Sequence, residues 1–377
     1  MKKLGIIGAS YLQLPLINKA KAMGLETHVF AWAANDVGET AADHFYPISI
    51  IEKDQILEKC REIKIDGICS IASDLAMTTV NYVAEKMGLP GNSIEATLVS
   101  TNKHLMRDRF AENGDPSPKS IRVDDADAVD PDAFEYPVIV KPEDRSGSRG
   151  ISKIADGSEL KEAVRLAMDA GFNGHALIEE FVDGEEFSAE AISVNGVHKL
   201  LATTKKYTTG APHFIETGHM EPAFAQGTEM FMKIENMVYH ALDGLGIKNG
   251  ASHTEYKINA SGEMKLIEIG GRMGGDCIGS SLVHLSTGVD FVKAVIDVAL
   301  GNEPDIRITK DICAVVRYVF APKDIEILES IRKDPAVTVV EEYNIALPDH
   351  TVTDSSARSG YYIFTAEKLE DLRNYLD

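Results

Sequence analysis

The sequence predicts a mixed α/β and α+β protein that opens with a parallel, doubly wound sheet. Apolar runs alternate with helical periodicity in the first quarter of the chain, and paired strands dominate its middle. Of the 377 residues, 44% are hydrophobic and 26% are charged, as in ordinary globular proteins. A chain of this length is too long for one core, so roughly two or three domains are expected.

The start of the chain alternates between predicted strands and predicted helices. Apolar runs predict strands at residues 4–7, 26–32 and 66–71. Helical spacing predicts helices ending at Ala22 and covering residues 53–63 and 77–87. Alternation at this spacing indicates a parallel sheet covered by helices. The first strand runs into Gly5-x-x-Gly8-x-Ser10, which favours a plain strand-to-helix turn over a dinucleotide site, because GxGxxG is incomplete.

The remainder of the chain is richer in strands. Further strands are expected at residues 136–140, 176–181, 186–194, 312–320, 337–340 and 361–365, with two more around Ser261-Gly262. Further helices are expected at residues 160–170, 228–245 and 288–300. Residues 207–224 contain few apolar residues and much Gly, Thr, His and Pro, so a long functional loop is expected there. The last strands alternate with helices and predict a small α/β cap.

Charge and composition exclude several classes of partner. The net charge of −21 argues against nucleic acid, because phosphate binding requires a basic surface. No apolar window reaches the length of a membrane span, and the apolar N-terminal run is interrupted at Gln13 and Asn18 without a convincing cleavage site. The four cysteines form no CxxC pair, which predicts buried, reduced thiols and no zinc site formed by them. A cytoplasmic protein is expected.

A lysine at the end of a predicted strand precedes a loop of small residues. Lys141 closes the strand, and the following segment carries Ser146, Gly147, Ser148 and Gly150 together with two arginines. Small residues let backbone N–H groups approach phosphate oxygens, and lysine and arginine supply positive charge. The segment therefore suits a triphosphate, although it lacks the GK[ST] ending of a Walker A loop. A flexible surface hairpin is the alternative interpretation.

Two strands meet at an acidic junction between residues 177 and 187. An adenine needs backbone N–H and C=O groups in an apolar slot, and a ribose needs a carboxylate for its hydroxyl groups. Glu179, Glu180 and Val182 could provide the first, and Glu186 the second. A solvated hairpin loop is the alternative that these residues alone favour.

A second hairpin predicts a pair of facing carboxylates. If Ser261-Gly262 forms a two-residue loop, Ala260 faces Glu263 and Glu255 lies directly opposite Glu268. Directly opposed like charges are destabilising unless a cation lies between them. Two carboxylates together with nucleotide phosphates are ligands that Mg²⁺ favours. Arg272 follows and could meet a transferring phosphoryl group. An exposed hairpin remains the alternative, since a one-residue slip would separate the acids.

Taken in order, these segments resemble the ATP-grasp superfamily over about residues 1–300. The resemblance implies phosphate contacts from Lys103 and Lys141, a phosphate flap at residues 146–150, and an adenine hinge at Glu179, Glu180 and Val182. It implies a ribose contact from Glu186, metal ligation by Glu255 and Glu268, and a γ-phosphate contact from Arg272. It also implies a pre-ATP-grasp domain at 1–100, an ATP-grasp domain at 101–305 with a lid at 115–185, and a C-terminal cap at 306–377.

The sequence departs from the family pattern at one position. Many members carry Asn two residues after the second metal acid, where this chain has Gly270. The segment from Glu268 to Asp276 is similar to the variant found in amino-acid-ligase-type members, as are residues 213–219 and 354–360. The resemblance places His213, Glu216 and His219 at the acceptor substrate, while for each histidine alone a structural role is the alternative.

The activity implied by the resemblance is ATP-dependent ligation that requires Mg²⁺ or Mn²⁺. A small-molecule carboxylate would be phosphorylated to an acyl phosphate and captured by an amine, releasing ADP and phosphate. Joining of amino acids is the leading expectation. The alternatives are a purine-biosynthesis ligase similar to phosphoribosylglycinamide synthetase and a non-catalytic nucleotide-binding regulatory module. Related enzymes are often dimers, so a homodimer is a further expectation.

Overall fold

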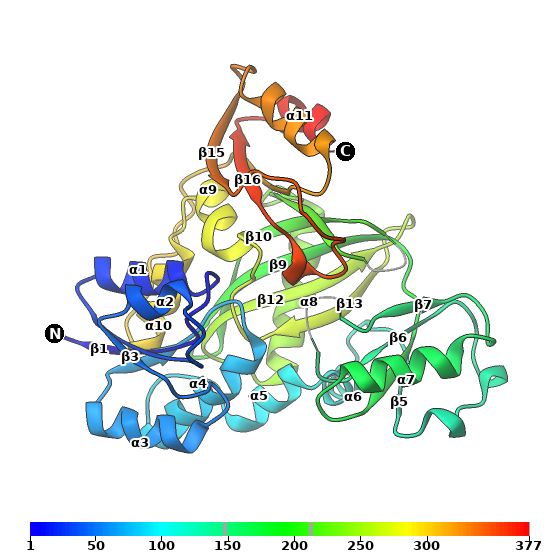
Figure 1. The fold of residues 1–377 in the computed structure, drawn as a ribbon, viewed down its shortest axis with the longest axis horizontal. Helices are drawn as coiled ribbons and strands as arrows, with labels where there is room; N and C mark the ends of the chain where they lie inside the picture. The colour runs from blue at the N-terminus through cyan, green and yellow to red at the C-terminus, as the bar shows by residue number, and fades with distance from the viewer. Residues whose placement is uncertain (146–148, 211–213, 377) are drawn as a thin grey trace.

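The first unit of the fold is a four-stranded parallel sheet with strand order β3-β2-β1-β4 (Figure 1). The computed structural model describes residues 1–145, 149–210 and 214–376. The strands are β1 (Lys3–Ile7), β2 (Glu26–Phe30), β3 (His44–Tyr46) and β4 (Gly67–Cys69). The helices between and after them are α1 (Leu14–Ala22), α2 (Val37–Ala41), α3 (Lys53–Ile63) and α4 (Asp74–Met87). The predicted parallel sheet is confirmed.

Successive side chains of β1 point to opposite faces of the parallel sheet, and helices bury them on both faces. Ile6 packs with Leu16 of α1 and with the later helix α10 (Phe291–Ala299). Ile7 packs on the other face with Leu57 of α3 and Val83 of α4. This two-sided burial explains the continuous apolar run in β1. The short β3 and α2 were not predicted, because three to five residues are too few to show a period.

Two short helices lead from this sheet toward the centre of the molecule. They are α5 (Ile94–Thr101) and α6 (Lys103–Asn113). The Asn102 side chain accepts a hydrogen bond from the backbone N–H of Leu105 and so caps α6. Because the cap fixes the start of α6, Lys103 lies in its first turn with its side chain 9% exposed.

A small antiparallel sheet, with order β5-β8-β6-β7, forms the lobe at the lower right of Figure 1. Its strands are β5 (Ser120–Val123), β6 (Val138–Pro142), β7 (Ser152–Ile154) and β8 (Ala176–Glu180). Helix α7 (Leu160–Ala170) covers one face and packs Val164 against Val140 and Ile178. The other face is left for the cavity described below.

The largest sheet has eight strands in the order β13-β12-β9-β10-β11-β14-β16-β15 and is antiparallel throughout. The strands are β9 (Glu185–Val194), β10 (Val197–Thr208), β11 (Glu216–Glu221), β12 (Gly250–Ile258), β13 (Met264–Gly270), β14 (Cys313–Tyr318), β15 (Val337–Tyr343) and β16 (Tyr361–Ala366). The helices of this part are α8 (Glu229–Leu245), α9 (Val283–Thr287), α10, α11 (Pro322–Ile331) and α12 (Leu369–Leu372). The predicted fold class is confirmed.

Strand β11 corrects the prediction of a continuous loop over residues 207–224. It pairs with β10 on one side and with β14 on the other, so it joins the C-terminal strands to the rest of the sheet. The strand signal was hidden because β11 buries polar residues, His219 and Glu221, where apolar ones would be expected.

The remaining global features concern thiols and membrane spans. The four cysteines are free, with Cys60, Cys69 and Cys313 buried and Cys277 partly exposed. Within the described ranges, no helix combines the length and the apolar character that crossing a membrane requires.

Candidate active site

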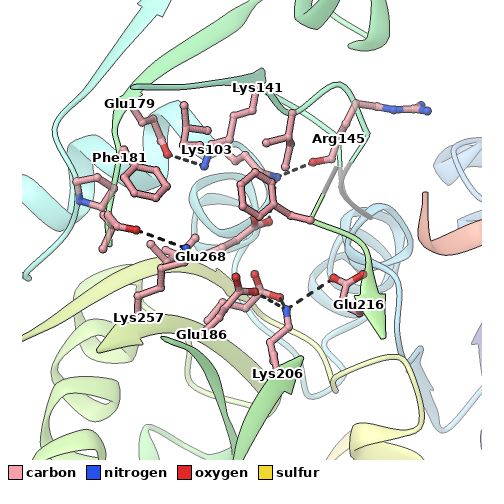
Figure 2. A pocket seen from close by; sticks show the side chains of 18 of the residues that line it. Lys103, Lys141, Arg145, Glu179, Phe181, Glu186, Lys206, Glu216, Lys257 and Glu268 are labelled. Carbon is pink, nitrogen blue, oxygen red and sulfur yellow. Dashed lines mark hydrogen bonds and ion pairs between the residues drawn. The ribbon is translucent and has the colours of Figure 1, made fainter. Parts of the chain in front are cut away.

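A cavity of about 180 Å³ lies between the small sheet and the central sheet (Figure 2). Lys141 and Glu179 project into it from the small sheet, and Glu186 and Lys206 project from the central sheet. Segments from four separate parts of the chain therefore meet here. The further lining residues are Lys103, Pro118, Ile139, Arg145, Ile151, Glu180, Phe181, Val182, Phe214, Glu216, His253, Glu255, Lys257, Ile267, Glu268, Gly270 and Arg272.

At the wall formed by the small sheet, one carboxylate is held by two cations, Lys141 of β6 and Arg107 of α6. Lys141 Nζ lies 2.7 Å from Glu179 Oε2, and Arg107 Nε lies 2.8 Å from Glu179 Oε1. All three side chains are at most 6% exposed. Burial alone would raise the pKa of Glu179, but Arg107 and Lys141 lower this pKa to about 2. Burial lowers the pKa of Lys141, which Glu179 offsets only in part.

Lys103 connects this wall to the hairpin opposite. Its Nζ donates to the backbone oxygen of Arg145 at 2.7 Å and to Glu268 Oε1 at 3.0 Å. Burial opposes the charged form, yet Glu268 raises the pKa of Lys103 above its ordinary value. A buried, charged lysine at the first turn of α6 adds to the positive end of the helix dipole.

The hairpin β12–β13 places Glu255 directly opposite Glu268, as predicted, although the predicted loop was wrong. The turn is one residue longer, because Asn259 pairs with Glu263 by a backbone hydrogen bond of 3.1 Å and Asn259 Oδ1 accepts from the N–H of Ser261. A β-bulge after Glu255 then shifts the register back by one residue. The two departures compensate, and the carboxylates stay face to face.

Lys206 of β10 lies at the centre of the opposite wall and was not predicted from the sequence. Its Nζ lies 2.6 Å from Glu255 Oε1, 3.1 Å from Glu186 Oε1 and 3.8 Å from Glu216 Oε1 (Figure 2). The side chain is 4% exposed. Burial works against the charged form, but the three carboxylates raise the pKa of Lys206 well above its ordinary value. A single lysine in a strand gives no pattern that could have revealed this role.

His253 links Glu255 to a second, fully buried carboxylate. Its Nδ1 lies 2.5 Å from Glu190 Oε1, and its Nε2 lies 3.2 Å from Glu255 Oε1. Burial would lower the pKa of His253, whereas Glu190 raises it to about 9. The imidazolium therefore contacts the same oxygen of Glu255 as Lys206 does and helps to hold this carboxylate in place.

Arg272 forms a bidentate ion pair with Asp74 at the start of α4. Arg272 Nε lies 2.9 Å from Asp74 Oδ1, and Nη2 lies 3.1 Å from Oδ2. The pair explains the glycine at position 270, because a Cβ there would lie 2.6 Å from Asp74 Oδ1 and 3.1 Å from Arg272 Nε. An asparagine at position 270 would displace this pair, so the departure from the family pattern has a steric cause.

A second cavity of about 220 Å³ adjoins the first and shares Lys206, Glu216, His253, Glu255 and Arg272 with it. Its other lining residues are Tyr11, Leu12, Ala72, Asp74, Arg149, His219, Gly275, Asp276, Ile278, Ser355 and Arg358. These residues come from all parts of the chain, including the segment between β15 and β16.

Charged groups of both signs line the second cavity. Arg358 Nη2 lies 2.7 Å from Asp276 Oδ1, and Ser355 Oγ donates to Glu216. His219 is 1% exposed, and neither of its ring nitrogens forms a hydrogen bond with a described residue; the nearest carboxylate oxygen, of Asp276, is 3.7 Å away. A buried imidazole without a hydrogen bond in a cavity wall is suited to a ligand.

Residues 134–280 match the family model described as ATP-grasp domain. This range contains the strand that ends at Lys141, the paired carboxylates Glu255 and Glu268, and Arg272. Over this range the chain carries an ATP-grasp domain. A curated relative, the alanine–anticapsin ligase of Bacillus subtilis (strain 168), is 27% identical over 307 residues, which cover 72% of this chain and 64% of the relative. The chain thus spans less than two thirds of that relative's length.

Solved structures share the fold of this chain over its whole length. The L-amino acid ligase of Bacillus licheniformis superposes with a TM-score of 0.83 at 23% identity, covering 100% of this chain and 96% of the other. The phosphoribosylglycinamide synthetase of Anaerococcus prevotii superposes with a TM-score of 0.73 at 20% identity, covering 100% and 97%. At these identities the likeness shows a common fold.

The structure brings together most of the predicted site residues that it describes. The predicted residues that line the first cavity are Lys103, Lys141, Glu179, Glu180, Val182, Glu186, Glu216, Glu255, Glu268 and Arg272. His219 lines the second cavity only, and Gly150 lines neither. Ser146, Gly147, Ser148 and His213 lie outside the described residues. The two acids of the predicted adenine hinge have different partners. Glu179 is bound by Arg107 and Lys141, whereas Glu180 pairs with Lys265 at 2.8 Å.

The carboxylates Glu255 and Glu268 fit a hard divalent cation. Their oxygens are the ligand type that Mg²⁺ prefers, and the register sets them face to face. Each is neutralised by an ammonium group, Glu255 by Lys206 and Glu268 by Lys103. A positive group beside each carboxylate is expected where two like charges are held close together.

Proposed function

We propose that this ATP-grasp protein is an ATP-dependent, ADP-forming carboxylate–amine ligase. The observation that carries the proposal is the junction of the two cavities at Lys206, Glu255 and Arg272. One cavity has the cations and the apolar slot that a nucleoside triphosphate needs. The other has charges of both signs, as a small zwitterion needs. A γ-phosphate held at the junction would face an acceptor in the second cavity.

The first cavity would hold ATP with its phosphates near Lys103 and Lys141. Backbone groups of residues 180–182 would meet the adenine, and Glu186 would accept hydrogen bonds from the ribose hydroxyls. Residues 146–150 would cover the phosphates. Mg²⁺ or Mn²⁺ would be held by Glu255 and Glu268 and would neutralise phosphate charge.

The residues of this chain would then position and stabilise the transfer. A carboxylate oxygen of the acceptor attacks the γ-phosphorus, and the bond between the β,γ-bridging oxygen and the γ-phosphorus breaks, releasing ADP. Arg272, oriented by Asp74, would contact the transferring phosphoryl group. An amine next attacks the acyl carbon of the acyl phosphate, loses a proton, and inorganic phosphate leaves. Closure of the cavity would protect the acyl phosphate from water.

Amino acids are the substrate class that the second cavity supports best. An α-ammonium group of an amino acid matches the carboxylates of Glu216 and Asp276, which both line this cavity. His219 supplies the hydrogen-bonding group that lacks a partner among the described residues. Similarity to the relative named alanine–anticapsin ligase also supports this substrate class.

A phosphoribosyl substrate is the second candidate. The superposition with a phosphoribosylglycinamide synthetase over 100% of this chain favours it. Such a substrate carries a dianionic phosphate, which needs a cation to bind it. Arg358 of the second cavity does not meet this need, because it is already paired with Asp276. The alternative of a non-catalytic regulatory module rested on Gly270 alone, and the contact with Asp74 accounts for this glycine by packing.

A coupled ADP-release screen tests the proposal. Purified protein, ATP and Mg²⁺ are offered pairs of amino acids and, separately, phosphoribosylamine with glycine, and products are identified by mass spectrometry. ADP release that requires both an acid and an amine, with a condensed product, supports the ligase. AMP as the product would contradict acyl-phosphate chemistry, and ATP binding without ADP release over the whole panel would favour the regulatory module.

A further inference from the structure

Two histidines and one glutamate converge on the parallel sheet of the N-terminal unit, outside both cavities. Glu26 and His28 lie two residues apart on β2, so their side chains share one face of the sheet. His44 of the edge strand β3 is the register partner of His28. One ligand atom from each of the three residues lies within 4.8 Å of the others. None of the three lines either cavity.

The two distances from Glu26 to the histidines match those between ligands of a tetrahedral metal. Glu26 Oε1 lies 3.0 Å from His28 Nε2 and 3.2 Å from His44 Nε2. Ligands at about 2.0 Å from a tetrahedral zinc ion lie about 3.3 Å apart. The two imidazole rings are stacked with centroids 4.7 Å apart. His44, with a side chain 50% exposed, has freedom to turn its Nε2 toward a shared ion.

An independent observation concerns the hydrogen bonds of His28. Its side chain is 4% exposed, and Nε2 makes no hydrogen bond to any described residue, although the Glu26 oxygen is near. The other ring nitrogen, Nδ1, is 3.1 Å from the hydroxyl of Tyr46. Metal-bound histidines use the same division, with one nitrogen on the ion and the other held by a hydrogen bond. A buried Nε2 that lies beside a carboxylate oxygen without forming a hydrogen bond is available to a ligand.

We propose that Glu26, His28 and His44 bind one zinc-class divalent cation, with a fourth position open to water. Imidazole donors select a transition metal over Mg²⁺, so this site differs in chemistry from the carboxylate pair Glu255 and Glu268. The ion would join the edge strand β3 to β2, because its ligands come from both strands. Lys3 is the nearby cation that opposes binding, but its Nζ donates to the backbone oxygen of Ile63 at 3.1 Å.

The test is zinc binding by the untagged full chain, measured by titration against a chromophoric chelator. Excess Mg²⁺ is present to occupy sites formed by oxygen ligands. One zinc ion per chain is expected, and His44→Ala should lose at least about tenfold in affinity. His350→Ala is the matched control, since His350 has a side chain 51% exposed and also lies beside a carboxylate, Asp349. Unchanged zinc binding by His44→Ala would overturn the proposal.

Two further measurements keep the proposal falsifiable. Zinc should raise the Tm of the wild type more than that of His44→Ala, because stabilisation by a ligand follows its affinity for the folded site. Co²⁺ in place of zinc should give the visible absorption of a tetrahedral site in the wild type and in His350→Ala. Absence of that absorption, or an equal Tm shift in His44→Ala, would mean that the metal binds elsewhere. These readouts do not depend on ligase activity, so they stand or fall separately from the proposed function.

Discussion

The two walls of the first cavity carry opposite balances of charge. At the small sheet, Lys141 of β6 and Arg107 of the neighbouring helix α6 share the single carboxylate of Glu179. On the central sheet, one lysine faces three carboxylates, and these residues are Lys206, Glu186, Glu216 and Glu255. Around Glu179 the cations therefore outnumber the carboxylate by one, and around Lys206 the carboxylates outnumber the lysine by two.

The difference shows how an acidic chain can accommodate a polyanion. With a net charge of −21, the overall field repels a triphosphate, so local cations must offset it. The small sheet supplies them where phosphates would lie. The carboxylates opposite suit a metal ion, which would bring its own positive charge. Burial, together with Arg107, lowers the pKa of Lys141, whereas three carboxylates overcome burial and raise the pKa of Lys206.

The largest expected effect comes from removing a carboxylate of the anionic wall. Glu268→Ala deletes one of the two facing acids, and ADP release should fall by about 10³-fold, because a bound metal contributes several kcal/mol to phosphoryl transfer. The measurement is steady-state ADP release at saturating ATP and Mg²⁺. Glu263→Ala, an exposed acid on the same hairpin, is the control and should retain wild-type activity. Activity of Glu268→Ala within a few fold of wild type would refute its role.

Removing a cation from the opposite wall should weaken the binding of ATP more than the binding of the metal. Lys141→Met should lower kcat/KM for ATP by about 10²-fold, since a charge-assisted contact to phosphate is lost. The fold should survive, because Glu179 keeps its bond to Arg107 at 2.8 Å. Lys265→Met makes the same change at the more exposed pair with Glu180 and should leave KM for ATP nearly unchanged. Equal effects of the two variants would contradict the assignment.

The cationic wall should also make stability depend on pH. Arg107 and Lys141 hold the pKa of Glu179 at about 2, against an ordinary value of 4.5. A lowered carboxyl pKa gives stability that is fully present above pH 4.5 and is lost as pH falls toward 2. The shift corresponds to about 3 kcal/mol.

Urea unfolding of the wild type and of Glu179→Gln at several pH values measures this dependence. The variant should be destabilised at pH 7, because two buried cations lose their partner. The difference between the two proteins should shrink between pH 4.5 and pH 2. A difference that stays constant across this range would show that Glu179 does not titrate with a lowered pKa.

The sequence predicted the long elements and the paired acids, and its failures have physical causes. Helices α3 and α7 match their predicted bounds, since their apolar periodicity is complete. The Glu255–Glu268 pair was predicted with the wrong turn, and a bulge that no local pattern reveals restored the register. Strand β11 was missed because two of its buried residues, His219 and Glu221, are polar.

Contacts between distant segments lay beyond prediction from the sequence alone. Lys206 meets carboxylates from three other strands, and no spacing along the chain encodes that meeting. The same holds for Asp74, which is 198 residues from Arg272. The cluster of His28 and His44 depends on β3, a three-residue strand too short to be recognised.

The smallest expected effect tests how the single arginine at the junction is oriented. Gly270→Ala would place a Cβ 2.6 Å from Asp74 Oδ1, so the Arg272–Asp74 pair must shift, and ADP release should fall by about tenfold. Gly271→Ala is the matched control, because its Cβ would meet only Ser100 Oγ at 3.5 Å and Ile247 at 3.6 Å. Its activity should stay near that of the wild type.

A double variant decides whether the effect of Gly270→Ala passes through Asp74. If it does, Asp74→Ala alone should lower ADP release to a similar extent, and combining the two substitutions should cost little more than either one, because residues that act as a unit are not additive. Full additivity would mean that the methyl group perturbs the site by another route. Arg272 would then need no partner to face the γ-phosphate, and the anionic wall would act through its carboxylates alone.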